Sequence, residues 1–247
     1  MNREIQKLFS QLIMSEKPVK IKLLGDSITH GVGGTGFVQN GEPIAAGFRR
    51  NPDGYCWAKQ FKEHMESRYN CIVTNNACTG TTIQFISEHF DELVSADDDI
   101  IICTIGTNNR HQYHYEEPHR SADEQRQFVF HEINRLYDKF VAIGKAEQVV
   151  FMANIPASAN DEKDGEGYSR LIHMPDIFEL YTKASHERGF LMIPMYMLFM
   201  NYCEMRGISF DSLLADGLHP NDAGYDVMFK LLMDEIGMPR KVPRAEF

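Results

Sequence analysis

The chain has 247 residues, of which 43% are hydrophobic and 24% are charged, and its formal net charge at pH 7 is -10. This length suffices for one α/β domain with its own core, and the composition is that of a globular protein and not of a disordered chain. The negative charge argues against a large nucleic-acid-binding surface, which needs clustered Lys and Arg residues. We therefore expect a single domain over residues 1–247 and no nucleic-acid partner.

The beginning of the chain shows no targeting signal. Residues 1–20 alternate charged and apolar side chains, so they lack the continuous apolar segment of a secretory signal. No stretch approaches the roughly 18 to 20 apolar residues of a membrane span. The five cysteines contain no C-x-x-C pair and are expected to be buried free thiols. These features predict a cytoplasmic protein without a membrane span, and no pattern indicates its oligomeric state.

Short apolar runs alternate along the chain with longer segments of helical period. This alternation predicts βαβ units around a parallel sheet, and the apolar runs contain few polar residues, as expected for strands covered on both faces. The predicted strands are residues 21–24, 71–75, 100–105, 149–155 and 191–195. The predicted helices are residues 56–68, 82–93, 122–143, 175–188 and 221–236.

The third predicted helix has one apolar face, and two of the connections between predicted elements are unusually long. Apolar residues recur along residues 122–143 at helical spacing and predict one buried stripe, formed by Phe128, Ile133, Leu136, Phe140 and Ile143. Residues 31–54 and 157–174 are too long for ordinary strand-to-helix loops. We expect each of these two connections to be either functional or mobile.

Residues 23–36, LLGDSITHGVGGTG, contain a glycine pattern that resembles a cofactor site. Gly31, Gly33 and Gly36 have the G-x-G-x-x-G spacing of a dinucleotide-binding turn, which must follow directly on a strand and open a helix. Here the predicted strand ends near Leu24, well before the first glycine, and the glycines and prolines that follow are incompatible with a helix. We therefore interpret the glycines as part of a flexible loop at the mouth of a site, and expect no organic cofactor.

The same stretch places Ser27 at the carboxyl end of the first predicted strand, where open parallel sheets bind their ligands. A serine alone is also an ordinary turn residue. A nucleophilic serine needs a histidine to accept its proton, a carboxylate to orient that histidine, and donors for the oxyanion. Among the ten histidines, His219 is distinctive because it follows Asp216 by three residues in the connection before the last predicted helix. One tight segment can thus supply both the base and its orienting carboxylate.

Two candidate oxyanion donors follow the second and third predicted strands. Gly80, in NNACTGTT, can present a backbone N–H without a side chain in the way. Asn108, in GTNN, can offer a side-chain amide. Each motif taken alone is also compatible with an ordinary turn.

Four segments, GDSIT at residues 25–29, NACTGTT with Gly80, GTNN with Asn108 and DGLHP at residues 216–220, carry a family resemblance. In order and approximate spacing they resemble the four blocks of the SGNH, or GDSL-type, hydrolases. The resemblance extends over nearly the whole chain, about residues 20–236. It implies a flavodoxin-like three-layer α/β/α sandwich with a five-stranded parallel sheet.

The resemblance also implies roles for individual residues. Ser27 would be the nucleophile, His219 the general base and then acid, and Asp216 its orienting carboxylate. The oxyanion hole would consist of the backbone N–H groups of Ser27 and Gly80 and the side chain of Asn108. The implied reaction is acyl transfer from an ester to water through a serine ester, without a metal or organic cofactor.

Two positions depart from the family pattern. Asn109 stands where the third block usually has an aspartate, and Thr81 follows Gly80 where an aspartate is frequent. The first of these positions usually supports local structure, so the change at Asn109 bears on the conformation of the loop more than on the chemistry. Neither change removes a proposed catalytic group.

The loop RHQYHYEEPHR after Asn109 suits a polar, ring-bearing ligand, because a long acyl chain needs continuous apolar walls. The residues expected to bind substrate are Asp26, Asn109, Arg110, His111 and Tyr113. The loop residues among them are equally compatible with packing of the loops or with solvation. The histidines of this loop have no carboxylate or cysteine partners at metal-ligand spacing, so no metal is expected.

We therefore predict a short-chain esterase whose substrate is a small-molecule or saccharide ester, most specifically a carbohydrate O-acetyl ester. Fold and triad do not by themselves choose a substrate. A lysophospholipase or thioesterase on the same fold, and a ligand-binding member without catalysis, remain alternatives.

Overall fold

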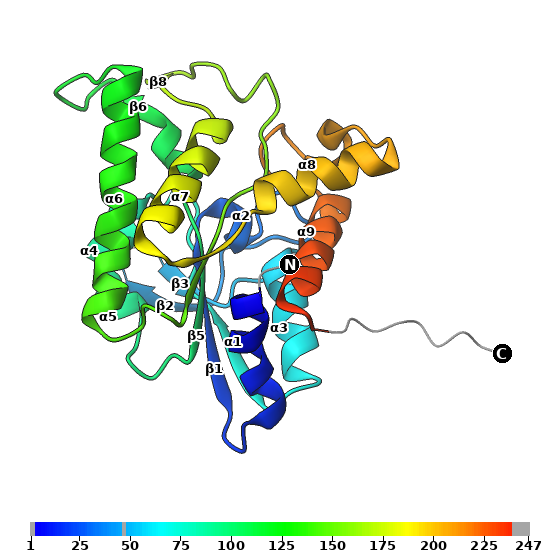
Figure 1. The fold of residues 1–247 in the computed structure, drawn as a ribbon. Helices are drawn as coiled ribbons and strands as arrows, with labels where there is room; N and C mark the ends of the chain where they lie inside the picture. Colours follow the sequence, from blue (N-terminus) through cyan, green and yellow to red (C-terminus); the bar gives the residue numbers. More distant parts are fainter. Residues whose placement is uncertain (1–2, 46–47, 239–247) are drawn as a thin grey trace.

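The computed structural model describes residues 3–45 and 48–238 of the chain. A five-stranded parallel sheet with the order β4-β1-β5-β7-β9 forms its centre (Figure 1). The strands are β1 (Val19–Gly25), β4 (Cys71–Asn75), β5 (Ile100–Thr104), β7 (Val149–Met152) and β9 (Leu191–Ile193). This is the strand order of flavodoxin-like folds, so the predicted fold class is confirmed.

The sheet contains the five predicted strands, with differences at their ends. β4 occupies the predicted residues 71–75, and β5 ends one residue before the predicted boundary. β7 ends at Met152, although residues 153–155 stay buried beyond the sheet. β9 ends at Ile193 because Pro194 has no amide hydrogen to donate to a neighbouring strand. α8 then begins at Met195.

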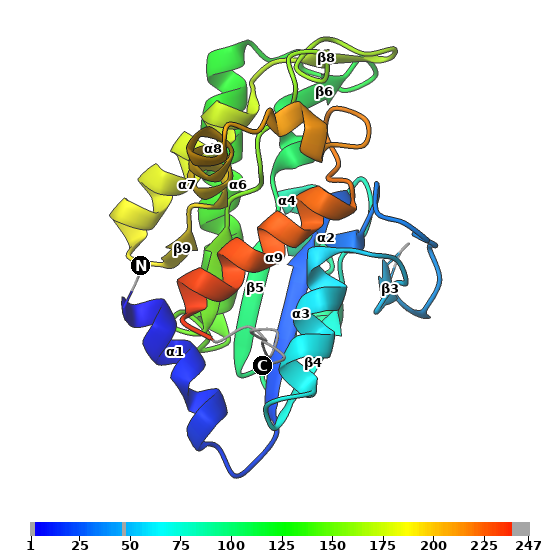
Figure 2. The same ribbon diagram turned by 90° about the vertical axis from the view of Figure 1, so that its right-hand side faces the viewer.

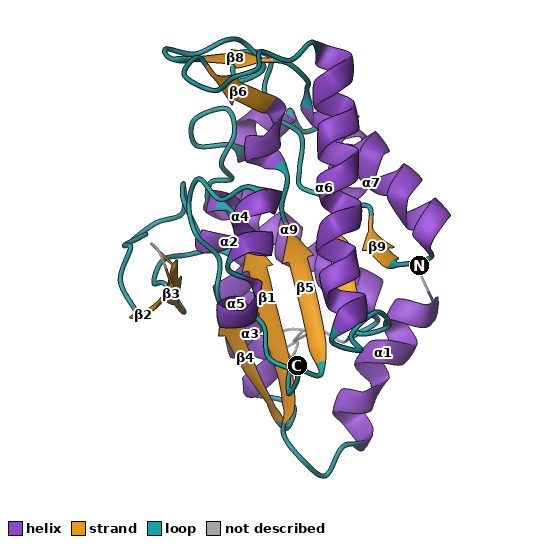
Figure 3. Cartoon of the chain, turned by 90° about the vertical axis from the view of Figure 1, so that its left-hand side faces the viewer, coloured by secondary structure: helices purple, strands orange, loops and turns teal. Residues whose placement is uncertain are grey.

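Helices cover both faces of the sheet. One face packs against α1 (Arg3–Met14), α3 (Trp57–Glu66), α8 (Met195–Arg206) and α9 (Asp222–Ile236), and Figure 2 shows α3 and α9 in front of the sheet. The other face packs against α4 (Ile83–Glu88), α5 (Phe90–Leu93), α6 (Ala122–Ala142) and α7 (Met174–Arg188), seen from the opposite side in Figure 3.

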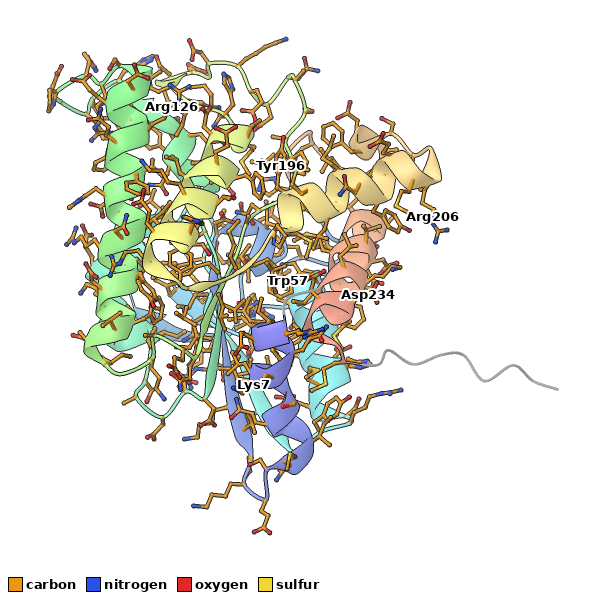
Figure 4. The ribbon with its side chains drawn as sticks, in the orientation of Figure 1. Lys7, Trp57, Arg126, Tyr196, Arg206 and Asp234 are labelled. Carbon is orange, nitrogen blue, oxygen red and sulfur yellow. The ribbon has the colours of Figure 1, made fainter. Side chains whose placement is uncertain are left out.

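Alternate residues of each strand point into the two layers, as the period of a strand requires. Ile100 and Ile102 of β5 lie in the first layer, and Ile101 and Cys103 lie in the second. Trp57, labelled in Figure 4, is fully buried in the first layer. The apolar runs of β5 and β7 are therefore strands with no solvent-facing side, whereas Ile72 of the edge strand β4 is exposed.

Four of the predicted helices are confirmed, and the fifth is divided. α3, α6, α7 and α9 match their predicted ranges within two residues at each end. The prediction of one helix over residues 82–93 is wrong, because His89 leaves the helical conformation, with ψ 20°, and separates α4 from α5. α1 and α8 were not predicted.

The buried face of α6 differs in part from the predicted stripe. Ile133, Leu136 and Phe140 are fully buried, whereas Phe128 and Ile143 lie only partly buried at its margin. The buried apolar residue in the first half of the helix is Val129, with the polar Gln125 and Glu132 buried beside it in the sequence of the helix. The stripe is therefore rotated by about one residue at its beginning, where the Phe128 ring packs under the Arg120 guanidinium instead.

Both long connections contain secondary structure. Residues 31–54 include a hairpin of β2 (Glu42–Ala45) and β3 (Phe48–Arg50), and residues 46–47 lie outside the described part. Residues 157–174 include β8 (Tyr168–Arg170), which pairs with β6 (His111–Tyr113) in an antiparallel sheet. β6 and β8 lie beyond the carboxyl ends of the central strands, above α2 (Ser27–His30) in Figure 3.

The five cysteines, all within the described residues, are buried and free, as predicted. Burial raises the pKa of each thiol above its ordinary value. Among the helices of residues 3–45 and 48–238, none is long and apolar enough to cross a membrane.

Candidate active site

Three side chains from distant segments form one chain of hydrogen bonds. Ser27 is the first residue of α2, directly beyond β1, and its Oγ lies 2.8 Å from Nε2 of His219. Nδ1 of the same imidazole lies 2.7 Å from Oδ2 of Asp216. With Nδ1–H donating to the carboxylate, Nε2 is left as the acceptor for the serine hydroxyl. The structure thus brings the three residues predicted from the sequence into the geometry of a Ser-His-Asp triad.

The loop between η2 (Phe210–Leu213) and α9 holds this geometry. Oδ1 of Asp216 accepts the backbone N–H groups of Leu218, at 3.0 Å, and of His219, at 2.8 Å. Burial acts to raise the pKa of Asp216, but the hydrogen bonds from His219 and Leu218 outweigh it and lower that pKa below its usual value. The carboxylate therefore stays ionised at neutral pH and orients the imidazole.

Asp26 supports the turn that carries Ser27. Its Oδ1 accepts the backbone N–H of Ile28 at 3.1 Å and caps α2, and its Oδ2 accepts from Nδ2 of Asn154 at 2.9 Å. Asn154 Nδ2 also contacts the hydroxyl of Thr107. Asp26 is fully buried, and burial raises its pKa. Both of its oxygens accept hydrogen bonds from the protein, so this buried carboxyl group supports the turn of the candidate nucleophile Ser27 and is not exposed to a substrate.

The two candidate oxyanion donors flank Ser27 because β1 lies between β4 and β5 in the sheet. Gly80, in the turn after β4, has φ 79°, a conformation that favours glycine, and nothing lies within 4 Å of where its Cβ would be. Asn108 lies in η1 (Thr107–Arg110) and donates from Nδ2 to the carbonyl of Thr81 at 2.9 Å. That contact ties the two donor turns together and leaves the second amide hydrogen of Asn108 for a ligand.

Asn109 and Arg110 are committed to contacts within the protein. Oδ1 of Asn109 accepts the N–H of Ile83 at the start of α4, and its Nδ2 donates to Gln84 Oε1. The Arg110 guanidinium is 1% exposed and pairs with Glu162 and Asp161, at 2.8 Å each. Asn109 thus supports local structure in place of the usual aspartate, and Arg110 holds the 157–174 connection. Arg110 presents no polar atom to a ligand in this arrangement, whereas Asn109 also lines the cavity beside Asn108.

His111 and Tyr113 line a cavity of about 280 Å³ that also reaches Asn108. Glu116 and Arg120 contribute charged groups to its wall. The Tyr113 ring is half exposed and stacks on Tyr115, with centroids 5.2 Å apart. These two of the expected substrate-binding residues therefore lie beside one of the candidate oxyanion donors.

The long connections contact the segment that carries His219 from both sides. In the first, the N–H of Thr35 donates to Asp222 Oδ1 at the start of α9, at 2.7 Å. In the second, the N–H of Ser158 donates to the carbonyl of Gly217, at 2.7 Å. The glycine-rich stretch therefore lies against the candidate site and has no strand-turn-helix geometry for a dinucleotide, as expected.

Asn154 was missed in the sequence, although it follows an apolar strand just as the candidate donors do. The predicted strand of residues 149–155 enclosed Asn154, whereas β7 ends at Met152, so only the observed strand end places it, like the candidate donors, just beyond a buried strand. His30, one helical turn after Ser27, was also missed, because its contacts are with residues far along the chain. Within the described parts of the chain no group of three or more metal-ligating side chains is placed to hold an ion, and the absence of a metal stays a prediction.

Comparison with known families places this geometry in context. Residues 23–227 match the model of the GDSL-like Lipase/Acylhydrolase family. The chain belongs to this family. It is therefore an ester hydrolase of the GDSL type, and the family resemblance of its sequence is confirmed.

Solved structures share the fold of this GDSL-like protein at low identity. The acetylxylan esterase Axe2 from Geobacillus stearothermophilus is 19% identical, with a TM-score of 0.64 over 92% of this chain and 98% of that one. LAE5, an alpha/beta hydrolase enzyme from the metagenome of Lake Arreo, Spain, is 18% identical, with a TM-score of 0.63 over 91% and 98%. No curated protein sequence matches the chain.

Proposed function

We propose that this GDSL-like ester hydrolase is a serine esterase that removes short acyl groups, foremost acetyl, from a saccharide. The observation that carries the proposal is the unbroken hydrogen-bond chain from Ser27 through His219 to Asp216. A serine needs such a base to become a nucleophile at neutral pH.

The reaction has two halves. The Oγ of Ser27 attacks the ester carbonyl while Nε2 of His219 accepts the hydroxyl proton. The oxyanion accepts hydrogen bonds from the N–H groups of Ser27 and Gly80 and from the Asn108 amide. His219 then returns the proton to the leaving alkoxide, and the sugar departs as an alcohol. Water attacks the acyl-enzyme by the same steps and releases the carboxylic acid and free Ser27.

The Axe2 structures support these assignments. Three Axe2 variants are described as catalytic mutants, and they replace a serine, an aspartate and a histidine three positions after that aspartate. The spacing of the last two equals that of Asp216 and His219. Axe2 is an acetylxylan esterase, also named an acetyl-xylooligosaccharide esterase, and we propose a similar substrate for this chain.

The cavity beside Asn108 supports a sugar as the alcohol part of the substrate. Tyr113 contributes a partly exposed aromatic ring to its wall, and Glu116 and Arg120 offer an acceptor and donors for hydroxyl groups. Sugar rings pack their C–H faces on aromatic rings and donate and accept many hydrogen bonds. A long acyl chain would need continuous apolar walls instead.

The decisive experiment compares hydrolysis of p-nitrophenyl acetate by the wild type and by Ser27→Ala. We expect kcat to fall by about 10⁴-fold or more with an unchanged melting temperature. Equal turnover by both proteins would disprove the nucleophile. No turnover by folded wild type would instead favour a ligand-binding protein on this fold.

A second series tests the substrate. The rate should fall from acetyl to octanoyl p-nitrophenyl esters, and acetylated xylo-oligosaccharides should be deacetylated. Tyr113→Ala should raise KM for the acetylated sugar at least severalfold but leave KM for p-nitrophenyl acetate nearly unchanged. A preference for octanoyl esters or acyl thioesters would favour a lysophospholipase or thioesterase.

The cytoplasmic location is likewise a proposal, supported by the five buried free thiols, which suit a reducing compartment.

A further inference from the structure

We propose that His30 is a positioning residue for the oxyanion hole, because it holds the backbone turn in which Gly80 presents its N–H. This inference rests on the proposed function, in which that N–H binds the oxyanion. His30 is the last residue of α2, the short helix that Ser27 begins. One helical turn would thus carry both the nucleophile and the group that positions a second oxyanion donor.

The contact is a hydrogen bond to the residue before Gly80. The backbone N–H of Thr79 donates to Nδ1 of His30 at 3.0 Å, and the Thr79 hydroxyl lies 2.8 Å from the same nitrogen. The N–H of Thr79 belongs to the peptide unit just before the one that carries the Gly80 N–H, so this hydrogen bond fixes the backbone up to the Cα of Thr79 and restricts how the chain enters the turn.

The turn around Gly80 has one backbone hydrogen bond of its own, from the N–H of Thr81 to the carbonyl of Cys78 at 3.3 Å. Thr79 and Gly80 are both exposed, and nothing packs within 4 Å of the position of a Gly80 Cβ. On either side, the N–H of Cys78 donates to the carbonyl of Gly25 and the carbonyl of Thr81 accepts from Asn108. His30 therefore adds a restraint from outside the turn, at the residue before the candidate donor.

The environment keeps the ring in the form that this contact requires. His30 is 1% exposed, and burial lowers its pKa to about 4. The ring is therefore neutral at pH 7, and Nδ1 retains the lone pair that accepts the N–H of Thr79. The Phe37 ring, from the long first connection, packs edge-on against the imidazole with centroids 5.1 Å apart.

Nε2 of His30 is buried and has no hydrogen-bond partner among the described residues. A buried polar atom without a partner carries a free-energy cost, so it calls for an explanation. A side chain that served packing alone would fill this site better as leucine. The hydrogen bond of Nδ1 to the Gly80 turn accounts for a histidine here.

The test uses two isosteric replacements, His30→Asn and His30→Leu. Asparagine places Oδ1 near the position of Nδ1 and keeps an acceptor, whereas leucine places a methyl group there. With p-nitrophenyl acetate, we expect His30→Leu to lower kcat about 10- to 100-fold with KM nearly unchanged, because one oxyanion donor is misplaced. His30→Asn should restore kcat to within about threefold of wild type.

A second readout is inhibition by phenylboronic acid, which forms a tetrahedral adduct with a nucleophilic serine. His30→Leu should weaken this inhibition in parallel with the loss of kcat/KM, and His30→Asn should not. Melting temperatures of both variants report folding. If His30→Leu does not fold, His30→Ala, which leaves space and removes the acceptor, should show the same loss of kcat.

The outcomes separate this inference from the proposed function. Equal turnover by wild type and Ser27→Ala would disprove the proposed function itself. Loss of activity in Ser27→Ala together with wild-type kcat in folded His30→Leu or His30→Ala would overturn only the role of His30. Equal losses in His30→Leu and His30→Asn would also overturn it, because the acceptor would then be irrelevant.

Discussion

Gly33 lies directly against the segment that carries His219. A Cβ at position 33 would lie 2.5 Å from the carbonyl oxygen of Pro220 and 3.0 Å from the Cβ of His219. Gly33 also has φ 93°, which residues with side chains rarely adopt. The second glycine of the G-x-G-x-x-G pattern is therefore required for close packing behind the candidate base and not for a phosphate.

Gly33→Ala should displace His219 from Ser27. A misplacement of about 1 Å at a reacting group can cost about 10²-fold in rate, so we expect kcat for p-nitrophenyl acetate to fall by at least about tenfold. Overpacking and the strained φ should also lower the free energy of unfolding by about 1–3 kcal/mol. Steady-state kinetics and urea unfolding measure the two effects.

Gly36→Ala is the matched control. Gly36 also has a positive φ, 72°, but nothing lies within 4 Å of where its Cβ would be. This variant should therefore lose some stability through backbone strain while it retains the wild-type kcat. An equal loss of kcat in both glycine variants would show that the packing against His219 is not the cause.

Removal of the Asn108 amide tests the third oxyanion donor. Asn108→Ala should lower kcat for p-nitrophenyl acetate about 10²- to 10³-fold, because this donor would act mainly in the transition state. Asn108→Asp keeps the shape but places a carboxylate where the oxyanion develops, so its loss should be at least as large. A kcat within threefold of wild type in folded Asn108→Ala would contradict the assignment.

Asn154 should stabilise the buried carboxylate of Asp26. Asn154→Leu removes the donor to Oδ2 and leaves a buried charge with fewer hydrogen bonds, which should lower the free energy of unfolding by about 2–4 kcal/mol. Asp26→Asn should reduce this penalty in the double variant, because no buried charge remains. Urea unfolding of the two single variants and the double variant measures the coupling, and strictly additive losses would argue against it.

The lowered pKa of His30 predicts that the free energy of unfolding decreases in mild acid. Its pKa is about 4 in the folded protein, whereas an unfolded histidine has a pKa of about 6.5. Between these values the unfolded chain binds a proton that the folded chain does not, so stability falls as the pH falls from about 6.5 to 4. The slope contributed by His30 is at most about 1.4 kcal/mol for each pH unit.

Urea unfolding at pH 7 and pH 4.5 checks this effect in wild type and His30→Asn. The variant should lose less stability on acidification, although some loss remains because burial also lowers the pKa of His111 to about 4. The lowered pKa of Asp216 acts in a lower window, since its contribution is lost only as the pH falls below the ordinary carboxyl range. An identical loss in both proteins would contradict the prediction.

Much of this molecule was predictable because its signals are local. β4 was predicted at its observed residues because Cys71, Ile72 and Val73 form a short apolar run between polar segments. Ser27, Gly80, Asn108 and His219 were identifiable because the topology of a parallel sheet brings the carboxyl ends of its strands to one edge. The order of the segments along the sequence carries that information.

Other features had no such local signal. In α8 the methionines lie on buried and exposed sides alike, so no single apolar stripe marks a helix. β6 and β8 are polar strands that pair across more than fifty residues, and a register of that kind depends on the tertiary structure.

The sheet and the candidate catalytic groups could be inferred from the sequence, because hydrophobic period and ordered motifs are visible along the chain. The contacts of each polar side chain, in contrast, depend on the tertiary structure. Arg110 and Asp26 resemble ligand-binding residues in the sequence, yet both are buried against protein partners more than fifty residues away along the chain. The burial of a charge depends on which distant groups can compensate it, and the fold alone brings those groups together.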